Sequence, residues 1–453
     1  MRETLVKTEE FKDSPVGRIP KDWDVFSLSK IVRKIKRGPS LAVNNDGVGV
    51  RYLTSDNISE SGEIDWAVCK HLDIKPELLD SLLSPGDVII NCVNSAAQIG
   101  KVSFIDSLHE TTTVGFNNFA LSLDKNLVVP RFTFYLFSHS LFQRQISATV
   151  KPAINQASFS SQDIISLCVP LPSIYEQQRI ADILDTVDQT IAHTSSLIAK
   201  LKQIKAGLLH DLLTRGLDEN GELRDAIGHP EQFKDSPLGR IPKDWDVRPL
   251  KALTDSSDSI TYGVLKPGEY VSGGIPLLQI QDVIHGEIEP LNLHRISKGL
   301  DAQYARTRLG GGEIVMSLVG TIGKIAQIPD SLTGANLHRN LARIPISLIN
   351  SSRFVFHYLQ SHIVQEAIAA TTFGSTQSLL NLADLRELLI ALPPPLEQQA
   401  IAKFIDTHDT RIRKEEAYRD KIKLQKKGLM HDLLTGKVRV KDVDKFTPAS
   451  DTV

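Results

Sequence analysis

The stretch FKDSPVGRIPKDWDV at residues 11–25 returns almost unchanged as FKDSPLGRIPKDWDV at residues 233–247. The two copies differ at one position, where Val16 of the first is replaced by Leu238 in the second. A repeat of this length is far longer than the roughly 20 to 50 residues of a solenoid unit. The chain is therefore predicted to contain two copies of one domain-sized module.

Two further matches follow at nearly the same spacing. LPSIYEQQRIADILD from Leu171 matches LPPPLEQQAIAKFID from Leu392, and GLLHDLLT from Gly207 matches GLMHDLLT from Gly428. The segments between these matched ends differ in sequence. We interpret near-identical ends around dissimilar middles as a common frame that holds two different recognition domains. A recent duplication whose middles drifted apart is the alternative.

The middles, residues 26–170 and 248–391, keep weaker similarities. We align Asn118-Phe119-Ala120 of the first with Asn340-Leu341-Ala342 of the second. Each middle mixes short runs rich in β-branched residues with turns of Gly, Pro, Asn and Ser and a few helical patches. This pattern predicts a compact α+β domain in each copy.

Each middle is followed by a segment with the apolar spacing of a long helix. From Ile174 to Leu213 apolar residues alternate at intervals of three and four, interrupted at Thr194 and Lys205, and a poorer seam runs from Leu396 to Thr435. At about 1.5 Å per residue, each helix spans about 60 Å. Two amphipathic helices of equal length are expected to pack on each other.

These observations set the expected boundaries along the chain. In chain order they are a first domain with its frame segment at 1–170, a long helix at 171–216, a linker at 217–232, a second domain at 233–391, a long helix at 392–436 and a flexible tail at 437–453.

The composition is that of a soluble globular protein. Hydrophobic residues make up 41% and charged residues 23% of the 453 residues, enough for two or three folded domains. The formal net charge of -2 argues against a protein that coats nucleic acid through bulk positive charge, but leaves room for a locally basic face. Lacking a run of about 20 apolar residues and an apolar signal-peptide core, the protein is expected in the cytoplasm.

The sequence carries no motif that predicts catalysis. The Gly-Lys pairs at 100–101 and 323–324 lack the glycine spacing and the following hydroxyl of a phosphate-binding loop, and the motifs of an amine methyltransferase are missing. Its 3 cysteines and 13 histidines have no zinc-ligand spacing. Asp87 and Glu313 fit turns that enter a strand better than a nuclease site. We expect no catalytic, cofactor-binding or metal-binding residues in this chain.

The duplicated motifs resemble the specificity subunits of Type I restriction-modification systems. The resemblance rests on GRIPKDW before each β-rich domain, on VPLPSIYEQQRIA leading into a long helix, and on Ile260-Thr261-Tyr262-Gly263 at the opening of the second domain. It covers nearly the whole chain. It implies two target recognition domains of the α+β class with pseudo-symmetry, separated by a pair of long antiparallel helices in a coiled coil.

The resemblance also implies a function and partners. The chain would have no activity of its own, and each domain would read one half of a split, asymmetric target in double-stranded DNA. The helices would set the spacer and dock two modification subunits, which carry S-adenosylmethionine and methylate adenine. Restriction subunits that use ATP and Mg would complete the complex, and no membrane is involved.

Residue type indicates the candidate DNA contacts, because Lys and Arg suit phosphates while Asn, Gln and Arg suit base edges. An ordinary solvated surface is the alternative for each of them. In the first domain the candidates are Arg33, Lys34, Lys36, Arg37, Lys101, Asn117, Asn118, Lys151, Asn155 and Gln156. In the second domain they are Lys266, Gln279, Gln281, Arg306, Arg308, Lys324, Arg339, Asn340, Gln377 and Ser378.

Two alternatives stay open at this point. The basic stretch from Arg411 to Lys427 could lie over spacer DNA, meet an acidic partner surface, or be a solvated helix face. The whole chain could instead be a scaffold whose coiled coil joins partners without binding DNA.

Trp23 and Trp245 are interpreted as core anchors rather than as stacking platforms.

Overall fold

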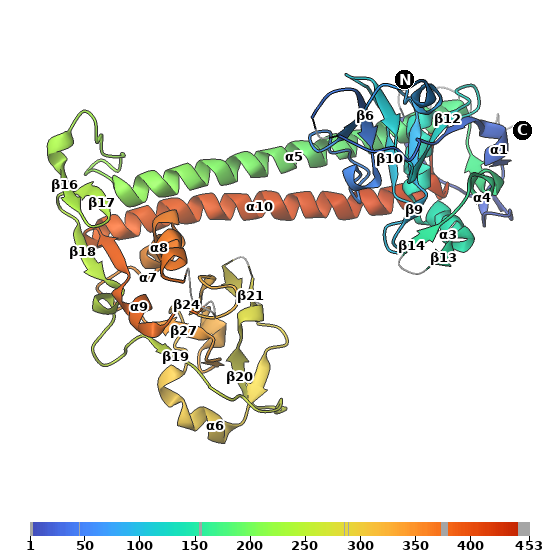
Figure 1. The fold of residues 1–453 in the computed structure, drawn as a ribbon. Helices are drawn as coiled ribbons and strands as arrows, with labels where there is room; N and C mark the ends of the chain where they lie inside the picture. Colours follow the sequence, from blue (N-terminus) through green and yellow to red (C-terminus); the bar gives the residue numbers. More distant parts are fainter. Residues whose placement is uncertain are drawn as a thin grey trace, which may run out of the picture. The chain divides into compact units, whose positions relative to one another are not determined.

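The computed structural model describes residues 3–44, 46–153, 156–284, 286–288, 290–372 and 379–442. The chain divides into two compact units (Figure 1). Unit 1 contains residues 1–194 and 418–453, and unit 2 contains residues 195–417. Each unit thus holds one of the predicted middles and a part of each long helix. Within the described residues, no helix combines the length and apolar character needed to cross a membrane.

The first middle in unit 1 contains sheets of three and four strands. The largest is antiparallel with the order β10–β8–β12–β5, at Val102–Phe104, Val88–Asn91, Asn118–Leu123 and Val32–Lys36. The second has the order β11–β6–β7, with β11 parallel to β6, at Thr112–Val114, Val50–Leu53 and Lys70–Leu72. The third has the order β13–β14–β9, at Lys151–Ala153, Gln156–Ser158 and Val93–Asn94.

Both faces of the central strand β8 are covered, which is why its four residues are all buried. Val88 and Ile90 join a core with Phe132 and Phe137 of α2, whereas Ile89 joins a separate cluster on the other face. The helices of the unit are α1 (Leu28–Ile31), α2 (Pro130–Ser138), α3 (Ser140–Thr149) and α4 (Ser161–Ser166), with short 3-10 turns η1 (Ser55–Asn57) and η2 (Pro76–Ser81).

Unit 2 repeats this plan. Its larger antiparallel sheet has the order β19–β27–β24–β25, at Thr261–Tyr262, Leu341–Ile344, Ile314–Ser317 and Ile325–Gln327. The next has the order β23–β20–β26, with β20 parallel to β26, at His294–Ile296, Ile275–Leu278 and Asn336–Leu337. A hairpin pairs β21 (Val283–Ile284) with β22 (Glu287–Ile288). Its helices are α6 (Lys298–Gln303), α7 (Ser352–Leu359), α8 (His362–Thr372) and α9 (Leu382–Glu387), and its 3-10 turns are η3 (Pro230–Gln232), η4 (Leu250–Leu253), η5 (Ile280–Asp282), η6 (Ala305–Thr307) and η7 (Asp330–Leu332).

The two long helices are antiparallel, as expected. They are α5 (Ile174–Thr214) and α10 (Pro395–Leu434). In unit 1, Ile180 and Leu184 near the start of α5 share a buried cluster with Leu433 at the end of α10. In unit 2, Leu212 near the end of α5 shares a cluster with Ile401 near the start of α10. The predicted α+β class with an antiparallel coiled coil is therefore confirmed.

The matched frame segments form the base of each unit. In unit 1, β2 (Phe11–Lys12) pairs with β3 (Ile19–Pro20), and β4 (Asp24–Ser27) pairs with β15 (Cys168–Leu171). In unit 2, β16 (Phe233–Ser236) pairs with β17 (Gly239–Pro242), and β18 (Asp246–Pro249) pairs with β28 (Leu389–Leu392). Trp23 and Trp245 have no exposed surface, which confirms that they are core anchors.

Two expected boundaries need correction. Residues 437–453 were expected to be a flexible tail, but Val438–Asp442 forms strand β29, paired with β1 at Glu3–Lys7. Residues 217–232 were expected to be a plain linker, but Leu217 is buried in the core of unit 2. The pairing of β29 with β1 and the burial of Leu217 both depend on residues far away in the sequence. Such contacts leave no local signal, so sequence patterns could not reveal them.

The strand registers also correct the alignment of the two middles. The N–H of Cys92 donates to the carbonyl of Asn117 at 2.8 Å, and the N–H of Leu318 donates to that of Asn340 at 2.8 Å. Asn340 therefore corresponds to Asn117, and the alignment with Asn118 was wrong by one residue. The error arose because the constant spacing of the matched ends is lost within the divergent middles.

A polar cluster ties the first recognition domain to the helices. In unit 1, the hydroxyl oxygen of Tyr135 on α2 lies 2.6 Å from a carboxylate oxygen of Asp185 and 2.8 Å from one of Asp188, and its single proton is shared between them. Arg131 forms an ion pair with Asp185 at 2.5 Å, and Lys426 of α10 forms one with Asp188 at 2.5 Å. These contacts join α2, α5 and α10 within one unit.

Unit 2 builds the same cluster with a histidine in place of the tyrosine. Nε2 of His357 lies 2.8 Å from Asp406, which also pairs with Arg353, and Lys205 pairs with Asp409 at 2.6 Å. His357 and the two aspartates lie within metal-ligand reach of one another. Because two cations already balance the two carboxylates, and because unit 1 uses a tyrosine there, we interpret this group as structural rather than as a metal site.

Unit 2 is expected to lose stability in mild acid through His357. Burial lowers the pKa of His357, and the hydrogen bond with Asp406 only partly offsets this. Its Nδ1 is buried without a hydrogen-bond partner among the described residues, so protonation would add an unsatisfied donor. An unfolded histidine titrates near about 6.5, so the contribution of neutral His357 is present above that pH and is lost as the pH falls below it.

Thermal unfolding across pH 5 to 8 would measure this, with His357→Tyr as the matched variant that copies unit 1. Between pH 8 and pH 5 the melting temperature of the variant should fall less than that of the wild type. His139 of unit 1, whose pKa burial lowers to about 4, remains in both proteins and cancels in the comparison. Equal acid sensitivity of the two proteins would contradict the assignment.

Candidate nucleic-acid interface

In unit 1 the parallel strands β6 and β11 end side by side, and several loops meet at that edge. Residues 54–57 follow β6, residues 115–117 follow β11, and Ser95 follows β9. Together with Ser40 and Gln156 these loops line a hollow of about 500 Å³. Its lining is rich in hydroxyl and amide groups, the side chains that suit base edges and phosphates. We name this region the first edge.

Two hydrogen-bonded side chains hold the loops of the first edge in place. The hydroxyl of Tyr52 donates to the carbonyl of Pro39 at 3.2 Å and accepts from the N–H of Phe116 at 2.9 Å. Nε of Arg37 donates to the carbonyl of Phe116 at 2.8 Å, and its guanidinium lies 4.1 Å from the centre of the Phe116 ring. The Phe116 side chain is 40% exposed. The edge therefore presents a preorganised arginine and aromatic pair to solvent.

Each unit needs a glycine where its backbone passes against the last residue of a parallel strand, Val114 of β11 in unit 1 and Leu337 of β26 in unit 2. A Cβ on Gly38 would lie 1.8 Å from the carbonyl oxygen of Val114, and one on Gly263 would lie 1.7 Å from that of Leu337. Neither position could hold a side chain without moving the backbone. The equivalence identifies the second edge, at the ends of β20 and β26 in unit 2.

The second edge has the same backbone and different side chains. The N–H of His338 donates to Leu278 at 2.9 Å, and that of Gly115 donates to Leu53 at 2.8 Å, so these two positions correspond. Arg339 then takes the position of Phe116. Tyr262, which is 45% exposed, precedes Gly263 as Arg37 precedes Gly38. Both edges thus carry one arginine and one aromatic residue, with the two positions exchanged.

His338 lies at the second edge beside Arg339. Burial lowers the pKa of His338, and the neighbouring Arg339 and His294 lower it further. Its Nδ1 lies 3.3 Å from the backbone N–H of Asn340, which requires an unprotonated acceptor. His338 is therefore neutral at physiological pH and shapes the loop rather than contributing charge.

The first-domain candidates lie in different parts of unit 1. Arg37, Asn117 and Gln156 lie at the first edge, and Nζ of Lys101 donates to the carbonyl of Ile58, just after η1, at 3.4 Å. Arg33 and Lys34 lie toward the other end of β5, in exposed ion pairs with Asp124 and Asp80, and Lys151 is exposed on β13. Asn155 lies outside the described residues.

Lys36 and Asn118 must be removed from the candidates. Lys36 is 8% exposed and forms an ion pair with buried Asp87 at 2.7 Å. Asn118 has no exposed surface and donates from its amide to the carbonyl of Leu53 at 3.2 Å. Both side chains satisfy polar groups inside the domain, so neither is available to DNA. The expectation that Asp87 belongs to a turn entering a strand is confirmed, because β8 begins at the next residue.

The second-domain candidates divide similarly. Gln279, Arg339 and Asn340 follow β20 and β26 at the second edge, with exposed Gln281 one turn further on in η5. Lys266 is exposed two residues after Val264, whose carbonyl accepts from Arg339. Arg306 and exposed Arg308 flank Thr307, which bonds to Asn336 at the opposite end of β26, and Arg308 pairs with Asp301. Gln377 and Ser378 lie outside the described residues.

The two glycine–lysine turns are held by equivalent glutamines. The side-chain amide of Gln143 donates to the carbonyl of Gly100 at 2.9 Å, and that of Gln365 donates to the carbonyl of Gly323 at 3.4 Å. Exposed Lys324 follows the second turn and lines a hollow of about 340 Å³. The two turns are thus equivalent, but Lys101 is half-buried and bonded to Ile58 whereas Lys324 is exposed.

Several residues of the edges were missed by the sequence reasoning. They are Tyr52, Asn94, Phe116, Tyr262 and His338. Phe116 could have been chosen as a candidate from the sequence. Its neighbours Gly115 and Asn117 are turn residues, which indicates that this aromatic side chain lies in a loop and not in a buried strand. Tyr262 belongs to the motif quoted at the opening of the second domain, whereas Tyr52, Asn94 and His338 carry no signal until the strands are paired.

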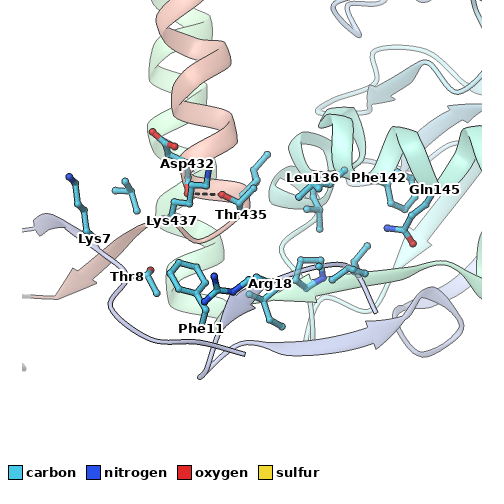
Figure 2. A pocket seen from close by; sticks show the side chains of 18 residues that line it. Lys7, Thr8, Phe11, Arg18, Leu136, Phe142, Gln145, Asp432, Thr435 and Lys437 are labelled. Atoms are coloured by element: carbon cyan, nitrogen blue, oxygen red, sulfur yellow. Dashed lines mark hydrogen bonds between the residues drawn. The ribbon is translucent and has the colours of Figure 1, made fainter. Parts of the chain in front are cut away.

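A larger hollow in unit 1, of about 590 Å³, is a different kind of site. Figure 2 shows that Leu136 and Phe142 lie on one side of it, while Phe11 and Arg18 come from the frame hairpin. The end of α10 supplies Thr435. Because its walls are mostly apolar and belong largely to the frame, we do not include this hollow in the candidate interface.

The fold and the two edges define a class of protein, a duplicated reader in which one frame carries two different recognition surfaces. A family model described as the type I restriction modification DNA specificity domain matches residues 20–203 and again residues 242–424. The chain therefore belongs to the family of type I restriction-modification specificity subunits.

Individual relatives agree. The chain is 31% identical over 445 residues to a putative type I restriction enzyme MjaX specificity subunit of Methanocaldococcus jannaschii, covering 96% of this chain and 98% of that one. It is 30% identical over 252 residues to the EcoBI specificity subunit of Escherichia coli, covering 54% and 52% of the two chains. The solved S subunit from M. genitalium has the same fold, with a TM-score of 0.55, 16% identity and coverage of 91% and 96%.

Proposed function

We propose that each unit reads one half of a bipartite, asymmetric target in double-stranded DNA, through the edge at the ends of its parallel strands. The observation that carries the proposal is the pair of edges. Their backbones are held by equivalent hydrogen bonds, while Arg37 and Phe116 of one correspond to Tyr262 and Arg339 of the other. A frame that is kept while the exposed residues differ suits two half-sites of different sequence.

The chain itself performs no chemistry in this proposal. Two modification subunits would dock on the long helices and bring S-adenosylmethionine, and restriction subunits would bring ATP and Mg. The helices, each about 60 Å long at about 1.5 Å per residue, would set the spacer between the half-sites. The rival function, a scaffold that does not bind DNA, predicts no sequence-specific shift of a duplex and no salt dependence.

Exchanging residues 26–170 for the same segment of a relative is expected to change one half-site and leave the other intact. The reason is that the first edge is built entirely within this segment. Methylation mapping in cells that carry the full system would identify both half-sites for each protein. Loss of both specificities in a folded chimaera would contradict independent reading. A wild-type protein with no sequence preference would favour the scaffold.

A further inference from the structure

One face of α10 in unit 2 is basic along its length. Lys403, Arg411 and Lys414 lie on it with Thr407 and Thr410, at helical spacings that bring all five to the side opposite the buried seam. All five side chains are exposed. The acidic residues of this stretch, Asp406 and Asp409, point instead into the cluster with His357 and Lys205. We call these five residues the basic face.

The basic face is concave. Its five residues line a hollow of about 610 Å³ together with Asp406 of α10 and with Ser351 and Arg353 at the start of α7. Ser351 caps α7, whose positive dipole end therefore borders the hollow. Arg353 and Asp406 pair with each other, so the excess positive charge of the hollow comes from the side-chain cations of the basic face and from the end of α7.

The cations of the basic face are not used inside the protein. Neighbouring cations are paired, Arg413 with Glu287 at 2.5 Å and Lys205 with Asp409 at 2.6 Å. Across the described residues, Lys403, Arg411 and Lys414 have no carboxylate within ion-pair distance. They remain available to an external anion.

The equivalent face of α5 has a different character. Counting back by the 221 residues that separate GLLHDLLT at 207 from GLMHDLLT at 428, Lys403 corresponds to Asp182, Arg411 to Thr190 and Lys414 to His193. The basic character therefore belongs to α10 and is not shared by its copy α5. The asymmetry indicates a partner that meets α10 and not α5.

We propose that the basic face binds the phosphate backbone of the DNA duplex next to the half-site read by unit 2. This proposal rests on the proposed function, because it needs DNA on that unit. Lys403 and Lys414 are 11 residues apart, or about 16 Å of helix, and duplex DNA carries a charge about every 1.7 Å along its axis. Several phosphates therefore lie within reach, and threonine hydroxyls can donate to them as well.

The test is the salt dependence of DNA binding by the full chain, alone and assembled with its modification subunits. The double variant Lys403→Gln with Lys414→Gln should bind the cognate duplex about 25-fold more weakly at about 0.15 M salt. The fall of log K with log salt should become shallower, its slope decreasing in magnitude by about 1.8. Both half-site preferences should stay unchanged, because backbone contacts carry no sequence information.

The matched control is Lys423→Gln with Lys427→Gln, which removes two exposed cations from the part of α10 that belongs to unit 1, outside the hollow. It should leave the slope unchanged. Equal loss in both pairs would overturn the proposal in favour of net charge. An unchanged slope with failed assembly of the modification subunits would overturn it in favour of an acidic protein surface. If the wild type showed no specific binding at all, the proposed function itself would fail.

Discussion

Replacing Arg439 by alanine is expected to lower the free energy of unfolding of unit 1 by about 3 to 5 kcal/mol, the usual cost of breaking a buried ion pair from one side. The guanidinium donates to Glu176 at 2.7 and 2.6 Å and to Asp22 at 2.7 and 2.8 Å. The Arg439 and Glu176 side chains are only 7% and 5% exposed. Alanine would leave the Glu176 carboxylate buried without its cation.

This ion pair joins the two ends of the chain. Arg439 lies on β29, Glu176 lies in the first turn of α5, and Asp22 belongs to the first frame segment. Burial alone would lower the pKa of Arg439, but its hydrogen bonds with Glu176 and Asp22 outweigh this and raise the pKa. The arginine therefore stays charged at every pH at which the protein folds.

Urea unfolding combined with hydrogen exchange of β29 would measure the loss. Arg33→Ala is the control, because its ion pair with Asp124 is 62% exposed on the arginine side and should contribute no more than about 1 kcal/mol. Adding Glu176→Gln to Arg439→Ala should recover part of the stability by removing the unpaired charge. An Arg439→Ala loss as small as that of Arg33→Ala would show that the cluster does not hold the unit together.

The elements that follow from local patterns could be predicted well. The apolar spacing placed α5 from Ile174 and α10 close to Leu396, and the helices begin at Ile174 and Pro395. Contacts between distant segments could not be predicted. Arg224, in what seemed a linker, pairs with Glu397 at 2.7 Å and repeats the role of Arg439 in unit 2. Nothing in the residues around Arg224 indicates that partner.

The candidate site shows the same division. By residue type the candidates include Arg33, Lys34, Lys36 and Arg37, but residues of a strand alternate between its two faces and extend along its length. Lys36 turns inward to Asp87, and Arg37 lies at the first edge, about 13 Å along the strand from Arg33 at about 3.3 Å per residue. Residue type thus identified plausible DNA contacts, while the strand geometry decided which of them share a surface.

Arg339→Ala is expected to weaken binding of the cognate duplex by about 1 to 3 kcal/mol, roughly 5-fold to 150-fold, and to relax the preference at one base pair of the second half-site. Arg339 is exposed, and its backbone N–H donates to Val264 at 2.9 Å, so the loop presents the side chain from a fixed backbone. A guanidinium presented in this way can bond to both acceptors on the major-groove edge of guanine, which no alanine can replace.

The comparison with unit 1 makes this prediction specific. Phe116 occupies the equivalent loop position, where it can contact a thymine methyl group or a sugar but cannot form hydrogen bonds with guanine. Because Phe116 lies in unit 1, Phe116→Ala should affect only the first half-site. Arg306→Ala is the charge-matched control, because Arg306 is exposed near the opposite end of β26. Binding to a panel of duplexes with single base-pair changes would separate the three variants. If Arg339→Ala weakened all duplexes equally, Arg339 would be a phosphate contact, and the exchanged arginine and aromatic positions would not set the difference between the half-sites.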